Sequence, residues 1–238
     1  GAPANTAQGQ YTVQRGDNLY SIAFRYGLDF RRMAAANGIN SPYTIYPGQK
    51  IQLREAAVVN RSSTASPSSS VHASGAASSK TVKARPPVTK PASSSAKKST
   101  ANKSVPASTS KSVAGGTVKS WRWPSSGKVI RGYSSSVHKG IDLSGKRGDA
   151  VIASAAGQVV YAGTGIVGLG ELIIIKHSEV YLSAYGHNDR LLVKEGETIK
   201  AGQKIALKGD SGTDIVKLHF EIRKEGKPID PQRLLPRR

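Results

Sequence analysis

The feature that most constrains the fold of this chain is a long stretch without a single aromatic residue, from about Ala56 to Ser120. Ser, Ala, Thr, Lys, Val and Pro make up most of it. Such a sequence buries too little apolar surface to offset an ordering cost of roughly 1–2 kcal/mol per residue. We therefore predict a multidomain chain, in which a disordered basic linker at residues 55–118 separates folded domains at residues 9–54 and 119–238.

The composition narrows the chemistry that the chain can perform. Its 238 residues include 0 Cys, which excludes disulfides, thiolate zinc sites and a cysteine nucleophile. The net charge of +20 draws the chain to polyanions, whether nucleic acid, anionic lipid or a polymer of the cell envelope. Nucleic-acid binding is the weakest of these alternatives, because no basic groove interleaved with aromatic residues and no nucleic-acid motif occurs.

The N-terminal segment from Tyr11 to Leu53 has the pattern of a small mixed domain. A short strand at residues 11–13 leads into a turn, after which Asp17 is placed to cap a helix. The helix has one apolar face, formed at i, i+3, i+4 and i+7 by Leu19, Ile22, Ala23 and Tyr26. A second helix at residues 30–37 and a final strand at residues 50–53 complete a βααβ order.

Two stretches of this segment, GDNLYSIAFRYG and IYPGQKIQL, resemble a LysM domain at the expected separation. The resemblance implies binding of peptidoglycan through its N-acetylglucosamine-containing glycan. It places the sugar groove between the first strand–helix loop and the loop before the last strand. The residues implied are Gly16, Asp17, Asn18, Leu19, Asn37, Ile39 and Ile45. The alternative role of Asp17 is to cap its helix, and that of Leu19 is to pack in the core.

The C-terminal segment contains many short runs rich in β-branched and aromatic residues. Turns rich in Gly and Asp or Asn separate these runs, which lie at residues 150–153, 157–162, 172–177, 181–185, 204–207 and 218–223. Regularly spaced short strands with little helical periodicity indicate a mainly antiparallel β fold.

Three motifs of this segment carry candidate chemistry: HKGID from His138, YGH from Tyr185 and LHFEIR from Leu218. Together they resemble the LytM (lysostaphin-like) zinc peptidases, which cut peptide bridges in bacterial cell walls. The resemblance implies His138, Asp142 and His219 as zinc ligands. Two imidazoles and a carboxylate with an open fourth position are typical of catalytic zinc. Whether Zn²⁺ is bound stays open from the sequence.

One position departs from the family pattern. The family attacks its substrate with help from the His of YxH, matched by His187, and from the first His of HxH, where this chain has Lys217. A protonated lysine, with a reference pKa of about 10.4, is a poor base. General acid–base help is worth about 10²–10⁴ in rate, so we expect no useful hydrolysis. The alternative is a zinc-dependent peptidoglycan endopeptidase in which Lys217 is tolerated.

The order of a LysM domain, a basic linker and a degenerate LytM-type domain resembles the NlpD family of Gram-negative envelope lipoproteins. The resemblance implies that the LytM groove docks onto an N-acetylmuramoyl-L-alanine amidase and activates it during cell separation. It also implies a periplasmic, outer-membrane lipoprotein. Mature members begin at a lipidated cysteine; since the chain has none, we expect it to start just after that residue, with membrane contact only through the missing anchor.

Overall fold

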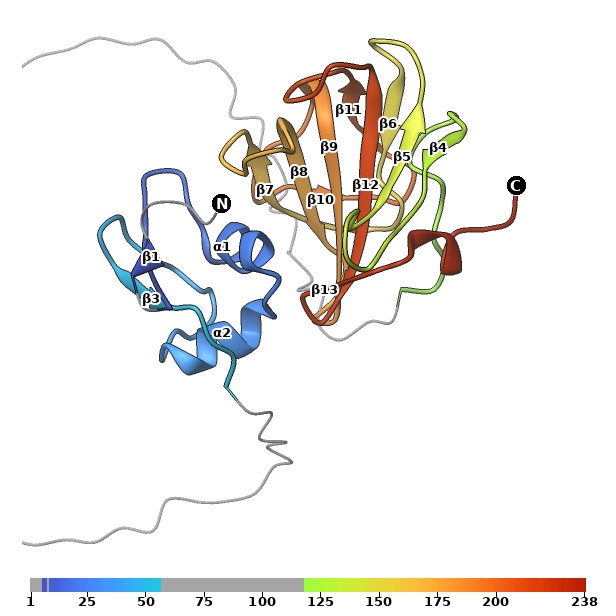
Figure 1. Ribbon diagram of the computed structural model, residues 1–238. Coiled ribbons are helices and arrows are strands. Elements are labelled where there is room, and N and C mark those ends of the chain that lie inside the picture. The colour runs from blue at the N-terminus through green and yellow to red at the C-terminus, as the bar shows by residue number, and fades with distance from the viewer. Residues whose placement is uncertain (1–5, 8, 57–117) are drawn as a thin grey trace, which may run out of the picture. The chain divides into compact units, whose positions relative to one another are not determined.

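The computed structural model describes residues 6–7, 9–56 and 118–238, in which an N-terminal and a C-terminal domain each have a hydrophobic core (Figure 1). The predicted disordered linker falls almost wholly at residues 57–117, outside the described residues. Within the described part of the chain, no helix is long and apolar enough to cross a membrane.

The N-terminal domain has the predicted βααβ order, which confirms that fold. Its elements are β2 (Gln10–Thr12), α1 (Leu19–Tyr26), α2 (Phe30–Ala36) and β3 (Lys50–Gln52). Strands β2 and β3 pair antiparallel, and a further strand that the sequence did not predict, β1 (Thr6–Ala7), pairs with β2. The helices cover a core formed by Tyr11, Val13, Leu19, Ile22, Ala23, Phe30, Met33, Ala34 and Ile51.

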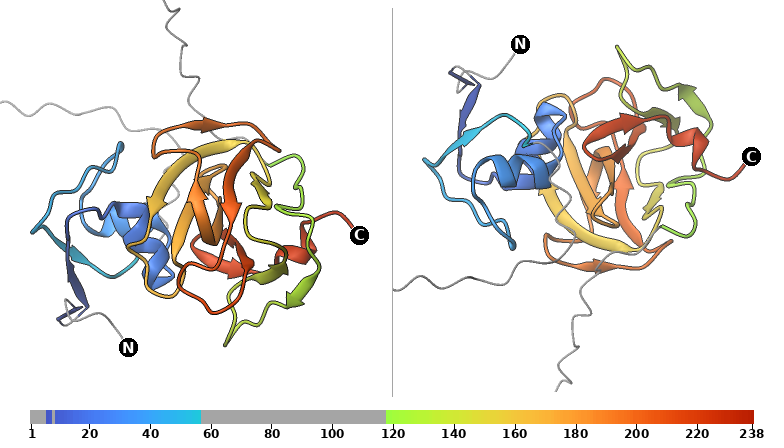
Figure 2. Two further views of the ribbon diagram at one scale, coloured as in Figure 1. Left: turned by 90° about the horizontal axis from the view of Figure 1, so that it is seen from above. Right: turned by 90° about the horizontal axis from the view of Figure 1, so that it is seen from below.

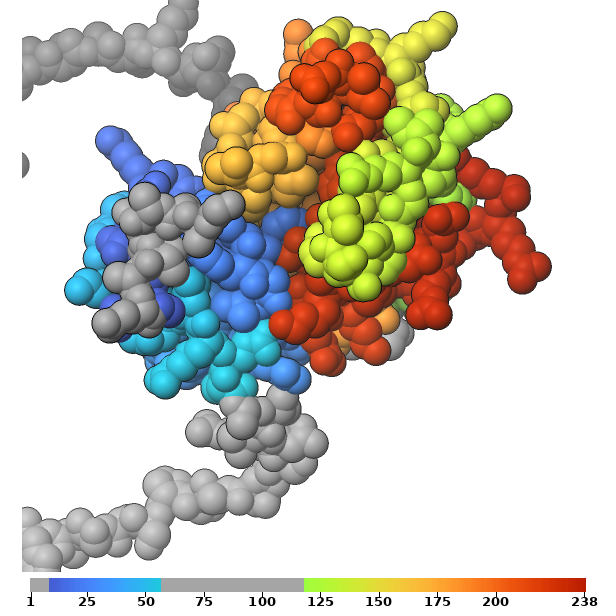
Figure 3. Space-filling model, viewed as in Figure 1, coloured from blue at the N-terminus to red at the C-terminus, as the bar shows by residue number. Residues whose placement is uncertain are grey.

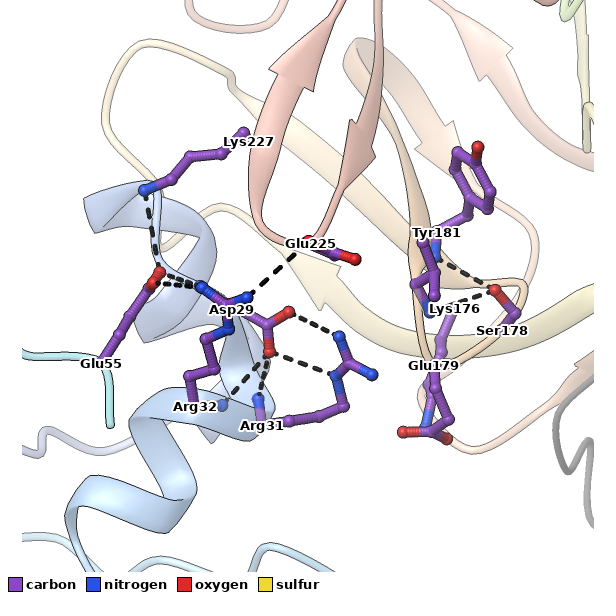
Figure 4. A network of polar contacts seen from close by, with 11 residues as sticks. Asp29, Arg31, Arg32, Glu55, Lys176, Ser178, Glu179, Tyr181, Glu225 and Lys227 are labelled. Atoms are coloured by element: carbon purple, nitrogen blue, oxygen red, sulfur yellow. Dashed lines mark hydrogen bonds and ion pairs between the residues drawn. The ribbon is translucent and has the colours of Figure 1, made fainter. Parts of the chain in front are cut away.

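A polar side chain caps the N-terminus of each helix in this domain. The prediction that Asp17 caps α1 is wrong, because Asn18 is the cap: its side chain accepts a hydrogen bond from the Ser21 backbone N–H at 2.8 Å, and the Ser21 hydroxyl accepts one from the Asn18 N–H. Asp17 instead accepts the Gln14 N–H and closes the preceding turn. In α2, Asp29 accepts hydrogen bonds from the N–H groups of residues 31 and 32 (Figure 4).

The C-terminal domain is built around a curved antiparallel sheet, as predicted (Figures 1 and 2). The path is β10-β7-β8-β9-β12-β5-β4, β13 pairs with β12, and β11 pairs with β6 and β9. The bounds are β4 (Val129–Arg131), β5 (Ile141–Ser144), β6 (Ala150–Ile152), β7 (Gly157–Gly163), β8 (Glu171–Lys176), β9 (Tyr181–Leu191), β10 (Thr198–Ile199), β11 (Lys204–Lys208), β12 (Lys217–Lys224) and β13 (Lys227–Ile229). A short 3₁₀ helix, Pro231–Arg233, follows.

The core of the C-terminal domain follows the two-residue period of its strands. Alternate residues of β8, Ile173 and Ile175, pack in one cluster with Leu143 of β5 and with Phe220 and Ile222 of β12. All five side chains are fully buried. This core fixes the register between β5 and β12, the two strands that carry the candidate site.

A buried network of polar side chains lies beside this core, next to the β8–β9 turn. The His177 imidazole lies 2.8 Å from the Ala156 carbonyl through Nδ1 and 2.7 Å from the Ser183 hydroxyl through Nε2. Its ring makes an edge contact with Trp121 at a centroid distance of 5.0 Å. The adjacent turn is closed by the Ser178 hydroxyl, which accepts the Tyr181 N–H (Figure 4). The network therefore joins β8 to β9 at one end of the sheet.

Candidate metal centre

The three residues expected as metal ligands meet at one point of the C-terminal sheet. Asp142 of β5 stands directly opposite His219 of β12 in the strand register, and His138 precedes β5. The Asp142 Oδ1 atom lies 2.8 Å from His219 Nδ1 and 3.2 Å from His138 Nε2. The three ligand atoms all lie within 4.8 Å of one another, and all three residues are buried. Two strands and one loop therefore bring together residues far apart in sequence.

The donor set fits a zinc ion. His138 Nε2 is buried and has no hydrogen-bond partner among the described residues, because its contact with Asp142 lacks hydrogen-bond geometry. Burial lowers the pKa of His138, which favours the neutral imidazole that a metal requires. Two imidazole nitrogens and one carboxylate oxygen are the ligands of many catalytic zinc sites. An unpartnered nitrogen beside a carboxylate is a place where a cation would be held.

A glycine allows the loop that carries His138 to approach β12. A Cβ atom built at Gly140 would lie 2.2 Å from the Phe220 carbonyl oxygen, well inside any real contact distance. At position 140 no larger residue fits without moving β5 from β12. The glycine of HKGID is therefore required by packing at the site.

Lys217 contacts the second oxygen of the Asp142 carboxylate. Its Nζ lies 2.9 Å from Asp142 Oδ2, and its side chain is only 13% exposed. Burial on its own would raise the pKa of Asp142, but hydrogen bonds from His219 and Lys217 hold it well below its ordinary value. Asp142 is therefore ionised, with a donor of the chain itself on each oxygen.

Sequence reasoning missed a second carboxylate at the site. Glu221 Oε1 lies 3.1 Å from His219 Nε2, and Glu221 also receives the Arg223 guanidinium at 2.8 Å. Burial alone would lower the pKa of His219, but its hydrogen bonds to Asp142 and Glu221 raise it above the ordinary value. The sequence signal that could have identified Glu221 is the two-residue period of β12, which puts residues 217, 219, 221 and 223 on one face of the strand.

His187 lies beside this cluster in an unusual backbone conformation. Its φ of 63° is in the left-handed region, and its ring centroid is 6.0 Å from that of His219. Nδ1 lies 2.8 Å from the Ser211 carbonyl, which can only accept, so Nδ1 carries the proton and Nε2 has a free lone pair. Burial lowers the pKa of His187 and keeps it neutral. Strained residues of this kind cluster at functional sites.

A groove of about 280 Å³ opens over these residues. Three loops surround it in Figure 3: the β4–β5 loop in yellow-green, the β7–β8 loop in amber and the β11–β12 loop in orange-red. The lining residues are Arg131, Val137, His138, Lys139, Gly168, Leu169, His187, Gly212, Thr213, Lys217, His219 and Glu221. Each loop carries one exposed aliphatic side chain: Val137 is 73% exposed, Val167 96% and Ile215 54%. We call these three residues the apolar rim.

The residues expected to bind glycan have mainly internal contacts in the N-terminal domain. Leu19 is fully buried in the core. The Asn37 side chain donates to the carbonyls of Met33 and Gln52 and accepts the Gln52 N–H at 2.6 Å, so it ties α2 to β3. Asp17 closes a turn and also accepts the Tyr11 hydroxyl hydrogen at 2.5 Å.

The other expected glycan residues lie in or near the two loops. Gly16 has a φ of 88° in the turn before α1, and Asn18 is the cap of that helix. Ile39 and Ile45 are partly buried against the core. The side chains of Asp17, Leu19 and Asn37 are thus committed to the fold, and backbone groups of the loops are left as the main candidates for hydrogen bonds to a sugar.

Comparison with known proteins agrees with both domains. Residues 11–54 match the family model described as LysM domain, and residues 136–231 match the one described as Peptidase family M23. The chain is 48% identical over 244 residues to the "Lipoprotein NlpD/LppB homolog" of Pseudomonas aeruginosa, covering 97% of this chain and 78% of the relative.

Two proteins of Escherichia coli strain K12 are similar along nearly the whole chain. The "Murein hydrolase activator NlpD" is 41% identical over 257 residues, covering 96% of this chain and 68% of the relative. The "Uncharacterized lipoprotein YgeR" is 43% identical over 230 residues, covering 95% and 80%. The similarity therefore includes both domains in the same order.

Proposed function

Because this chain belongs to the family of NlpD/LppB lipoproteins, we propose that it activates a peptidoglycan hydrolase and does not itself cut peptidoglycan. In this proposal the LysM domain holds the chain on peptidoglycan, and the groove of the M23 domain docks onto an N-acetylmuramoyl-L-alanine amidase. Activation then takes place on the wall during cell separation.

The observation that carries this proposal is the position of Lys217. Hydrolysis of an amide requires a group that removes a proton from the attacking water. The Lys217 ammonium is held on Asp142 at 2.9 Å, and an ammonium has no lone pair with which to accept that proton. His187 keeps a free Nε2 but lacks the second imidazole of the family pair. The site therefore has the shape of a hydrolase without its full proton-transfer machinery.

The groove has the properties of a protein-docking surface. The apolar rim comprises three exposed aliphatic side chains on the three loops that line the groove: Val137 lines it directly, Val167 is next in sequence to the lining residue Gly168, and Ile215 is two residues from the lining residues Thr213 and Lys217. Exposed apolar groups gathered around a groove mark interaction sites more often than single ones do. Arg131 and Lys139 add positive charge to the groove, which favours a partner segment with both aliphatic and acidic side chains.

The family also suggests where the protein acts. The relatives from Pseudomonas aeruginosa and Haemophilus influenzae are named as lipoproteins, the latter as an outer membrane antigenic lipoprotein. We propose that this chain acts in the periplasm as an outer-membrane lipoprotein. Its +20 charge would favour the anionic surfaces of that compartment.

A second candidate function, a zinc-dependent peptidoglycan endopeptidase, is favoured by the complete ligand set. His138, Asp142 and His219 would hold the ion. Bound zinc supplies a Lewis acid that polarises a carbonyl and lowers the pKa of water. His187 would then accept a proton at Nε2, and Lys217 would keep the Asp142 carboxylate in place. This candidate function requires His187 to perform alone the proton transfers for which the family uses two imidazoles.

Substitutions in the apolar rim test the docking proposal. We expect Val137→Asp, Val167→Asp and Ile215→Asp together to lower activation of the amidase at least about tenfold, because charged groups would be desolvated in the interface. The matched control is Leu192→Asp, since Leu192 is also an exposed aliphatic residue, 44% exposed, and does not lie on any of the three loops that line the groove. Sacculus binding should be unchanged in all variants. Equal activation by the rim and control variants would rule out docking at the groove.

The variant Lys217→His separates the two candidate functions. If the remaining machinery is that of a peptidase, restoring the family's imidazole should produce zinc-dependent release of peptide fragments from sacculi. The wild-type chain should show none under the same conditions. Equal zinc-dependent release by both proteins would favour the endopeptidase and overturn the activator proposal.

A further inference from the structure

The chain supplies its own cation where the fold family places a metal. Both oxygens of the Asp142 carboxylate have donors from β12: Lys217 Nζ at 2.9 Å from Oδ2 and His219 Nδ1 at 2.8 Å from Oδ1. The Asp142 side chain is only 2% exposed, so water does not compete for these positions. We infer that the Lys217 ammonium is a tethered replacement for the metal charge, which keeps the groove folded without zinc and weakens zinc binding.

The strand register makes this arrangement specific to Lys217. On β12 the residue opposite Asp142 is His219, while Lys217 stands two residues away, opposite Ser144 at one end of the short β5–β12 pairing. Residues 217 and 219 share one face of the strand, so the lysine lies diagonally across from the carboxylate. A four-carbon stem spans that diagonal and delivers the ammonium to Oδ2. The ion pair is therefore set by backbone pairing, although its members are 75 residues apart.

The burial of Asp142 determines how strongly the stability of the fold depends on the Lys217 ammonium. A buried carboxylate without a positive partner strongly destabilises a protein, and in a zinc peptidase the divalent ion supplies that partner. Here Lys217 is 13% exposed and Asp142 2%, so the pair is shielded from solvent. A metal entering the site would meet a like charge already on the same carboxylate. Arg131 of β4, which stands opposite Asp142 in the β4–β5 register, adds further positive charge.

The inference does not depend on the proposed function. It concerns the stability and metal affinity of the site, whichever partner or substrate the groove takes. It predicts that this groove keeps its shape when free zinc is scarce, whereas a groove that depends on zinc would not. A docking surface benefits from such independence because its shape must be ready before the partner arrives.

The test measures zinc binding and thermal unfolding of the full chain, without any activity assay. Zinc affinity is measured by titration against a chromophoric competitor, and melting is followed with and without a chelator. The main variant is Lys217→Met, which is unbranched and only one atom shorter, and which removes the charge. Lys217→Arg retains the charge. Lys139→Met is the matched control, since Lys139 lines the same groove but its Nζ donates to the Ser135 carbonyl.

We expect the wild-type melting temperature to be the same with and without chelator. Lys217→Met should bind zinc at least about tenfold more tightly than wild type, because a like charge near the ion is gone. Its melting temperature without zinc should fall by at least about 5 °C and recover when zinc is added. Lys217→Arg and Lys139→Met should bind zinc as the wild type does.

Two results would overturn the inference. One is a wild-type melting temperature that drops on chelation, which would show that the native site depends on a metal. The other is equal zinc affinity in the wild type and Lys217→Met. Failure of Lys217→Met to fold even with zinc would also count against the inference, since zinc should then supply the missing charge, and the wild-type chelation experiment does not rely on that variant.

Discussion

Buried His177 should make the C-terminal domain less stable in mild acid. Its Nδ1 faces the Ala156 carbonyl and its Nε2 the Ser183 hydroxyl, so both ring nitrogens have hydrogen-bond partners, and it is burial that disfavours the charged ring. Burial lowers the pKa of His177 to about 4. In the unfolded chain the pKa is about 6.5, so between these values only the unfolded state binds the proton. Stability is therefore complete above about pH 6.5 and falls as the pH drops towards 4.

The size of this effect follows from the difference in pKa. From pH 7.5 to 4.5, His177 should reduce the free energy of unfolding by about 2.5 kcal/mol. The assay is urea unfolding followed by tryptophan fluorescence, because both Trp residues, Trp121 and Trp123, report on this domain. His177→Asn keeps a donor near Ala156 and removes the titration, and the difference between wild type and variant cancels the other groups. A difference that stays constant from pH 7.5 to 4.5 would refute the reasoning.

Three further predictions concern stability. Asp142→Ala should lower the free energy of unfolding by about 3 kcal/mol, since it leaves buried cationic groups without their carboxylate; an unchanged urea midpoint would contradict this. Gly140→Ala should cost about 1–3 kcal/mol because its Cβ would meet Phe220 at 2.2 Å, whereas Gly132→Ala, with nothing within 4 Å, should cost less in the same assay. Asp29→Ala should destabilise the LysM domain by about 1–2 kcal/mol in thermal circular dichroism, and Asp29→Asn, which keeps an acceptor, should cost less.

Much of the fold could be predicted because its signals are local. Six runs of β-forming residues correspond to strands of the C-terminal sheet, and the 3.6-residue apolar period of residues 19–26 corresponds to α1. Among the strands that escaped prediction is β10 at Thr198–Ile199, whose two residues are too few for any period to be recognised. The predicted cap of α1, Asp17, was one residue too early, because Asp and Asn cap helices equally well. The Ser three residues after Asn18 completes the capping box and decides between them.

The candidate site depended on information that no local pattern contains. Motifs identified His138, Asp142 and His219 as a set, but their convergence is a consequence of the pairing between β5 and β12. The contact of Lys217 with the carboxylate depends on the same register. A sequence shows that a lysine replaces a histidine; only the pairing shows that its charge reaches Asp142.

The central claim is that this chain activates a peptidoglycan hydrolase and does not cut the wall itself. The most direct test is dye release from labelled sacculi by the purified chain in the presence of zinc, alone and with a resting N-acetylmuramoyl-L-alanine amidase. We predict that the chain alone releases no dye and that it increases release by the amidase. Release by the chain alone, abolished by a chelator, would contradict the account and establish a zinc peptidase that works with Lys217 in place.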